Sequence, residues 1–161
     1  MPKRLIRYAV VGLGHIAQVA VLPAFGNARR NSKLIALVSG DPVKREQLGK
    51  KYDVHHTYSY DQYDACLRSE IDAVYIALPN SMHCEYTVRT AEAGKHVLCE
   101  KPMAISSAEC RRMIDACRRA KVKLRIAYRI HFDATFQHVR QMVQSGALGE
   151  VEAFSGWVLM S

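Results

Sequence analysis

Directly after the apolar run IRYAVV, the chain carries the glycine motif GLGHIA at positions 12–17. Gly12 permits a tight turn from strand to helix, and Gly14 lets the backbone approach a pyrophosphate. Ala17 allows the following helix to lie close to the sheet. The motif alone is weak, but the strand before it and the helical segment after it favour dinucleotide binding over a purely structural turn. The predicted binding residues of this loop are Gly12, Leu13, Gly14, His15 and Ile16.

Short apolar runs rich in Val, Ile and Leu alternate with longer segments of helical period along most of the chain. This alternation is typical of βαβ units in a parallel sheet. The expected fold class is therefore α/β, a Rossmann-type doubly wound parallel sheet. The strands are predicted near residues 5–11, 34–38, 54–57, 72–78, 95–99 and 122–127.

Local signals predict the boundaries of the helices between these strands. Asp41 is followed by a proline, which indicates an N-cap and a helix that runs to about residue 52. Ser81 is predicted to cap the next helix, and Gly94 to end it in the left-handed conformation. Pro23 interrupts the first helical segment, which is expected to kink or restart there.

The segment from Ser106 to Glu109 has the spacing of a capping box and predicts a further helix. Its apolar face repeats at i, i+3, i+4 and i+7, so the two cysteines on that face are expected in the core. The chain has five cysteines, an odd number without C-x-x-C spacing, which predicts reduced, packed thiols and no metal site. The predicted face consists of Cys110, Met113, Ile114 and Cys117.

The pattern changes after the sixth strand. A helix is predicted from about residue 133 to 145, with Gly146 as its stop. The alternating run GEVEAFSGWVLMS, residues 149–161, predicts a strand of a new sheet. Because an unpaired strand that displays Phe154 and Trp157 would be prone to aggregate, truncation or an evolved remnant is expected there. The expected domains are a Rossmann domain at 1–128 and the truncated start of an α+β substrate and oligomerisation domain at 129–161.

Composition and charge argue against several functions. The chain is 49% hydrophobic and 24% charged, as ordinary globular proteins are, and no apolar run approaches the roughly 18 residues of a membrane span. No membrane attachment is therefore expected, and the reduced thiols indicate the cytoplasm. The formal charge of +8 comes from scattered basic pairs without interleaved aromatic residues, so nucleic-acid binding is the weakest alternative.

The end of the second predicted strand bears on the choice between NAD and NADP. An acidic residue there would bind the ribose hydroxyls and repel a 2′-phosphate, but the strand ends in Ser39-Gly40. The nearest carboxylate, Asp41, is expected to cap a helix instead. Ser39 can donate to a phosphate, Gly40 leaves room, and Lys44 or Arg45 can supply positive charge. NADP is therefore the predicted cofactor, unless the two basic residues only form a solvated face.

Polar residues also follow the fourth and fifth predicted strands. The segments 78–83 and 99–102 lie at the carboxyl ends of parallel strands, the edge at which open α/β sheets bind ligands. A lone histidine or lysine in these segments would more often be a solvated surface residue. Their common edge with the glycine turn favours a function. The residues predicted to bind or act there are Leu78, Pro79, Asn80, His83, Glu100 and Lys101.

Five segments in fixed order span nearly the whole chain: AVVGLGHIA, VSGDPVK, DAVYIALPNSMH, AGKHVLCEKPMA and AYRIHFD. In these segments the chain resembles the glucose-fructose oxidoreductase, inositol dehydrogenase and rhizopine-catabolism family. Its VSG segment and the pair Tyr58 and Tyr60 most resemble glucose-fructose oxidoreductase, which binds NADP tightly. The resemblance implies hydride transfer between a carbon of a sugar or polyol and the nicotinamide.

The resemblance also implies roles for single residues. It places Lys101 beside the nicotinamide and the sugar carbon, where an ammonium favours a developing alkoxide and helps to organise proton transfer. Glu100 is implied at the nicotinamide ribose and Arg129 at the reactive end of the cofactor, whereas Tyr128 and His131 act there or pack at the domain junction. The other implied contacts are Ser39, Lys44 and Tyr60 at the adenosine end, and Leu78, Asn80 and His83 at the ribose and diphosphate.

In this family, a large open-sheet domain supplies an Asp and a His that complete the catalytic group. The sequence does not include these two residues. Two functions therefore stay open. The chain is the cofactor-binding part of an NADP-dependent oxidoreductase, or it is a non-catalytic dinucleotide sensor or interaction module. The Glu100-Lys101-Pro102 motif favours the enzyme, because a sensor has no evident need of that lysine. The expected partners are the dinucleotide and a sugar or polyol, with a homo-oligomer only through the second domain.

Overall fold

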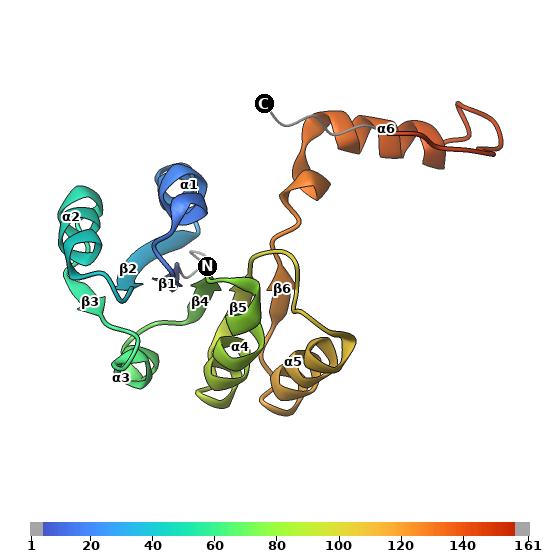
Figure 1. The fold of residues 1–161 in the computed structure, drawn as a ribbon. Helices are drawn as coiled ribbons and strands as arrows, with labels where there is room; N and C mark the ends of the chain where they lie inside the picture. Colours follow the sequence, from blue (N-terminus) through green and yellow to red (C-terminus); the bar gives the residue numbers. More distant parts are fainter. Residues whose placement is uncertain (1–4, 157–161) are drawn as a thin grey trace. The chain divides into compact units, whose positions relative to one another are not determined.

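The computed structural model describes residues 5–156 and divides the chain into two compact units, Met1–Ala127 and Tyr128–Ser161. The first unit contains a parallel sheet in the order β3-β2-β1-β4-β5-β6 (Figure 1). The order reverses between β1 and β4, and in open α/β sheets ligands bind at such a switch point, outside the carboxyl ends of the strands. The strands are β1 Ile6–Val11, β2 Ser32–Val38, β3 His56–Tyr58, β4 Ala73–Ile76, β5 His96–Cys99 and β6 Leu124–Ile126.

Helices cover both faces of this sheet, which confirms the predicted doubly wound fold. Successive strand residues point to opposite faces, so Val10 packs in one core cluster while Ala9 and Val11 pack in the other. The cluster of Val10 includes η1 Ala17–Val21, α1 Leu22–Asn27 and α2 Pro42–Tyr52. The other cluster includes α3 Tyr63–Arg68, α4 His83–Glu92 and α5 Ser107–Arg119 (Figure 1).

All six predicted strands are present, but their ends differ by up to two residues from the prediction. The third begins at His56 instead of residue 54, and the sixth is confined to Leu124–Ile126. The fourth ends at Ile76, although the apolar run predicted an end at residue 78. The neighbouring strand β1 ends at Val11, and the chain turns away at Gly12. No further residue of β1 is therefore available to continue the pairing, and Ala77 and Leu78 form a loop.

Most helix signals are confirmed. Asp41 caps α2 by accepting a hydrogen bond from the Lys44 N–H, and Ser106 caps α5 through the Glu109 N–H. Gly94 has the predicted left-handed conformation with φ +71°. The predicted cap at Ser81 is wrong: the residue lies in the 3₁₀ turn η2, Asn80–Met82, which leads directly into α4. Backbone bonds of this turn, such as the one from the His83 N–H to the Asn80 carbonyl, replace a side-chain cap.

The segment after the glycine turn is irregular, as the proline in it predicted. It runs as a π-helical stretch, η1, and then as α1, in which Pro23 occupies the first turn. Pro23 has no N–H to donate, and a first-turn position needs none. Ala17 in η1 is completely buried against β1 and β2, which agrees with its predicted role in close packing.

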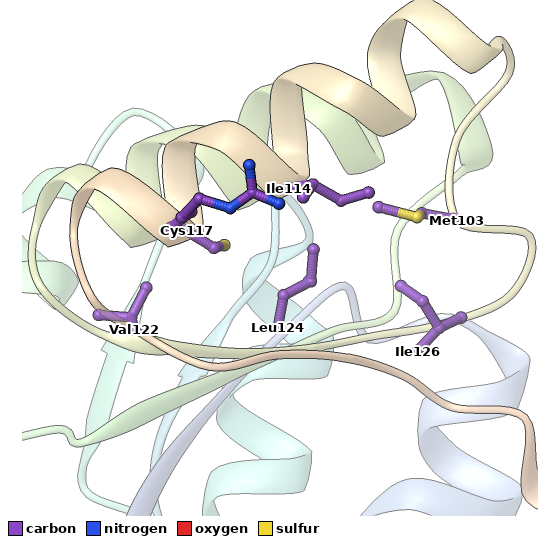
Figure 2. Close-up of a pocket in the computed structure, with 7 residues that line it drawn as sticks. Met103, Ile114, Cys117, Val122, Leu124 and Ile126 are labelled. Atoms are coloured by element: carbon purple, nitrogen blue, oxygen red, sulfur yellow. The ribbon is translucent and has the colours of Figure 1, made fainter.

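The predicted apolar face of α5 is only partly in the core. Met113 and Cys117 are buried, Cys110 is half-buried, and Ile114 is 42% exposed. Figure 2 shows the cause: Ile114 lies beside Leu124 of the edge strand β6, along an open apolar hollow of about 360 Å³. β6 is the last strand of the sheet and has no further strand beyond it among the described residues, so the outer rim of the face stays accessible.

The cysteines are free, and four of the five are buried. Burial in apolar surroundings disfavours the charged thiolate, and it raises the pKa of Cys66 and of Cys99 to about 12. These thiols are therefore protonated and unreactive at neutral pH, which confirms the interpretation of the cysteines as packed side chains.

The second unit contains the 3₁₀ turn η3, Arg129–Phe132, and the helix α6, Ala134–Gln144. Asp133 caps α6 through the N–H groups of Thr135 and Phe136, and Gly146 follows with φ +74°, as predicted. The predicted strand is wrong for residues 149–156, which form no strand or helix, and residues 157–161 of the prediction lie outside the described part. A strand is held by hydrogen bonds to a neighbour, and no other strand occurs among the described residues of this unit.

Candidate functional site at the carboxyl edge of the sheet

The turn after β1 can be made only by glycine at its first position. Gly12 has φ +89°, and its N–H donates to the Val38 carbonyl at 2.9 Å. A Cβ atom there would lie 2.4 Å from the Ala77 carbonyl oxygen, well inside contact distance. The requirement for Gly12 is therefore structural.

Gly14 has a different environment. It is exposed, its φ lies outside the left-handed region, and a Cβ atom there would meet no atom within 4 Å. The fold itself therefore does not require glycine at this position. The open space beside the backbone is what close approach of a pyrophosphate needs. Of the other predicted residues of this loop, Leu13 is buried, Ile16 is half-buried and His15 is exposed.

The end of β2 gathers the residues predicted at the adenosine end. Ser39 is buried, and its hydroxyl accepts a hydrogen bond from the Asp41 N–H at 3.2 Å. The Asp41 carboxylate accepts from the Lys44 N–H at 3.1 Å, and this bond lowers the pKa of Asp41. Its other oxygen lies 3.4 Å from the Lys44 ammonium. Asp41 thus caps α2, as the sequence predicted, and it also pairs with Lys44, which the sequence did not predict.

Arg45 lies closer to the end of β2 than the sequence could indicate. Its guanidinium donates to the Ser39 carbonyl at 2.5 Å. Tyr60 lies beside Gly40, and a Cβ atom on Gly40 would come within 3.2 Å of the Tyr60 ring. The end of β2 is therefore surrounded by the positive charge of Arg45, the small residue Gly40 and the aromatic ring of Tyr60. The hydrogen bond to Ser39 already holds the guanidinium in this place.

The loop after β4 combines buried and exposed residues. Leu78 is buried and lies over Gly12, with its Cδ2 atom 3.1 Å from the position of a Cβ on that glycine. Pro79 and Asn80 are exposed at the same edge. His83 was predicted beside the cofactor, but its ring is completely buried, with both nitrogens against backbone carbonyls. Any effect of His83 on a ligand must therefore pass through the loops that it contacts.

The loop after β5 holds a buried carboxylate next to an exposed lysine. Glu100 is only 4% exposed, and it accepts hydrogen bonds from the Tyr75 hydroxyl at 2.8 Å and from the Lys101 N–H at 3.3 Å. The Lys101 side chain is exposed and has no ion pair with any described residue. It leads into Pro102 through a cis peptide bond. The ammonium of Lys101 is thus available to a ligand, whereas the carboxylate beside it is held.

Sequence reasoning missed Tyr75 as part of this site. The only signal was a tyrosine within the otherwise aliphatic strand AVYI. Tyr75 and Glu100 are 25 positions apart, and the parallel pairing of β4 with β5 brings them together. A buried carboxylate is costly unless it is hydrogen-bonded, so Tyr75 stabilises the position of Glu100.

We expect Tyr75→Phe to lower the free energy of unfolding by about 1–3 kcal/mol, because it leaves one oxygen of a buried carboxylate without its donor. Urea unfolding at neutral pH measures the change. Tyr8→Phe on β1 is the matched control, since the Tyr8 hydroxyl has no hydrogen bond to the described residues. Equal stability losses in the two variants would contradict a role for Tyr75 in holding Glu100.

Arg129, the remaining predicted residue, belongs to the second unit together with Tyr128 and His131. It lies in η3 and is exposed, and the rings of Tyr128 and His131 meet edge to face with centroids 6.2 Å apart. Its role at the reactive end of a cofactor stays a prediction.

The opposite edge of the sheet offers a contrasting surface. A hollow of about 500 Å³ lies at the amino ends of β1, β2 and β3, lined by residues that include Arg7, Lys33, His55 and His56. The Arg7 guanidinium is engaged there by Asp72 and Glu70. Among residues 5–156, no cluster of His, Cys, Asp or Glu is arranged to hold a metal ion, and no helix is long and apolar enough to cross a membrane.

Comparison with known proteins assigns this architecture. Residues 6–128 match the family described as "Oxidoreductase family, NAD-binding Rossmann fold". The crystal structure of aldose-aldose oxidoreductase from Caulobacter crescentus, complexed with glycerol, superposes with a TM-score of 0.86 at 44% identity. That match covers 91% of this chain and 44% of the other.

Two further relatives carry different cofactors in their names. D-xylose 1-dehydrogenase [NADP(+)] of Haloarcula marismortui is 31% identical over 147 residues, which are 90% of this chain and 41% of that protein. The WlbA dehydrogenase from Bordetella pertussis, in complex with NADH and UDP-GlcNAcA, is 27% identical with a TM-score of 0.81. This second match covers 91% of this chain and 44% of the other. The chain therefore spans less than half the length of the proteins it matches.

Proposed function

This chain belongs to the glucose-fructose oxidoreductase, inositol dehydrogenase and rhizopine-catabolism family of oxidoreductases, and from that membership we propose that it forms the cofactor-binding part of an NADP-dependent oxidoreductase of sugars or polyols. The glycine turn carries the proposal. Gly12 is fixed by the fold, whereas Gly14 borders open space that the fold does not use. That space lies at the sheet edge where α/β folds bind dinucleotides.

The residues around the end of β2 support NADP as the cofactor. The carboxylate that could select against a 2′-phosphate is occupied by the α2 cap and by Lys44. Arg45 presents a guanidinium beside Ser39, and a guanidinium binds phosphate through several donors at once. Tyr60 supplies an aromatic surface next to Gly40.

We expect the chain to bind NADP(H) more tightly than NAD(H), as measured by titration calorimetry with both cofactors. Arg45→Ala should weaken NADP(H) binding by about 10- to 100-fold, the range of a charged hydrogen bond, and leave NAD(H) binding nearly unchanged. Lys50→Ala on the same helix is the control, because Lys50 pairs with Glu46. Equal affinities of the wild type for the two cofactors would contradict the NADP assignment.

The residues after β5 support hydride-transfer chemistry. A nicotinamide bound at this edge would accept or donate the hydride at the sugar carbon. The Lys101 ammonium would stabilise the developing alkoxide and, in the direction of reduction, donate the proton that completes the sugar hydroxyl. Glu100, held by Tyr75, would accept hydrogen bonds from the hydroxyls of the nicotinamide ribose.

A further inference from the structure

We propose that His83 is a positioning residue that fixes the loop of Lys101 relative to the loop that follows β4. The inference rests on the proposed function, because these two loops form the carboxyl edge at which the dinucleotide is placed. His83 is the first residue of α4, and its side chain is completely buried. It therefore acts on a ligand only through its neighbours.

The two ring nitrogens reach different loops. Nε2 lies 2.9 Å from the Leu78 carbonyl oxygen, and Nδ1 lies 2.8 Å from the Pro102 carbonyl oxygen. Carbonyls only accept hydrogen bonds, so both contacts are hydrogen bonds when both nitrogens carry protons, and a neutral ring makes one of them. Leu78 follows β4 and Pro102 follows β5. One side chain thus joins the two loops.

The contacts continue from these loops to the glycine turn. The Ala77 N–H donates to the Val11 carbonyl at 2.8 Å, and the Ala77 carbonyl oxygen packs against Gly12. A continuous series of contacts therefore runs from the turn at Gly12 through the β4 loop and His83 to the β5 loop. At one end is the predicted place of the pyrophosphate, and at the other is Lys101. His83 sets the separation between them.

Two substitutions separate the two contacts. The amide nitrogen of asparagine occupies roughly the place of Nδ1, so His83→Asn keeps a donor toward the Pro102 carbonyl and loses the contact with Leu78. The amide nitrogen of glutamine occupies roughly the place of Nε2, so His83→Gln keeps a donor toward the Leu78 carbonyl and loses the contact with Pro102. A purely structural histidine would respond to both changes in the same way.

The test uses NADPH as the probe with the chain as it stands. His83→Asn should weaken NADPH binding by about five- to tenfold, the effect of one hydrogen bond, while the bound nicotinamide keeps its wild-type fluorescence. His83→Gln should keep the affinity and lose most of the fluorescence change at the nicotinamide. Amide hydrogen exchange without NADPH should accelerate near residues 78–82 in the first variant and near 101–105 in the second.

A matched control removes two other buried hydrogen bonds from α4. Thr90 donates to the Tyr86 carbonyl and contacts the Tyr63 hydroxyl, both at 2.6 Å, and Thr90→Val should leave both loops and both NADPH signals unchanged. Identical effects of His83→Asn and His83→Gln, or exchange unchanged in both loops, would overturn the inference. Failure of the wild type to bind NADPH would overturn the proposed function, and the exchange data would still decide the role of His83.

Discussion

In an active oxidoreductase that contains this chain, Lys101→Ala is expected to lower turnover by about 10²- to 10⁴-fold, the usual contribution of a general acid or base. Lys101 is exposed at the carboxyl edge without an ion pair to the described residues, so its ammonium is free to meet a developing alkoxide. The affinity for the cofactor should change little, because the proposed adenosine and pyrophosphate contacts lie elsewhere. Pre-steady-state hydride transfer at saturating cofactor measures the effect.

The competing interpretation makes Lys101 a phosphate ligand or a structural residue. It predicts weaker NADP binding, with turnover at saturating cofactor nearly preserved. Lys123→Ala is the matched control, because this exposed lysine precedes β6 at the opposite edge of the sheet and should affect neither quantity. A normal rate of hydride transfer in Lys101→Ala would remove this residue from the catalytic role.

Gly14→Val is expected to abolish dinucleotide binding while the domain stays folded. The open space and the ordinary φ at Gly14 accommodate a branched side chain, but that side chain would occupy the place of the pyrophosphate. Calorimetry with NADPH and circular dichroism on the same sample measure the two halves of the prediction. Unchanged NADPH affinity would refute the assignment of the phosphate loop.

Gly12→Ala, two residues earlier in the same turn, supplies the contrast. A Cβ on Gly12 would clash with the Ala77 backbone, and φ +89° disfavours any side chain. We therefore expect a loss of at least about 2 kcal/mol in the free energy of unfolding, from backbone strain and overpacking together. Urea unfolding measures it. A stable Gly12→Ala protein would mean that the turn is not as constrained as its contacts indicate.

The sequence predicted the parts of this fold that depend on local pattern. The six apolar runs, the cap at Asp41 and the left-handed Gly94 each reflect the chemistry of a few neighbouring residues, and all are present. Strand ends were less accurate, because they depend on where a neighbouring strand stops. The end of β4 at Ile76 follows the turn of β1, which the residues of β4 do not encode.

The site was predictable as a set of loops but not as a set of contacts. The glycine motif and the two polar clusters pointed to one edge of the sheet. The burial of His83, the hydrogen bond of Tyr75 to Glu100 and the bond of Arg45 to Ser39 depend on which segments the fold brings together. In each of these three cases the residue type is more common in other surroundings, so the residue type alone did not predict the contact.

Mapping of backbone amide chemical shifts during titration with NADPH tests the central claim most directly. The proposed site predicts saturable changes along the carboxyl edge, at residues 12–16, 39–45, 78–80 and 100–101. The amides around Lys33, His55 and His56, which line the hollow at the amino edge, should keep their positions. Changes centred on that hollow, or none that saturate, would contradict a dinucleotide site at the carboxyl edge of this sheet.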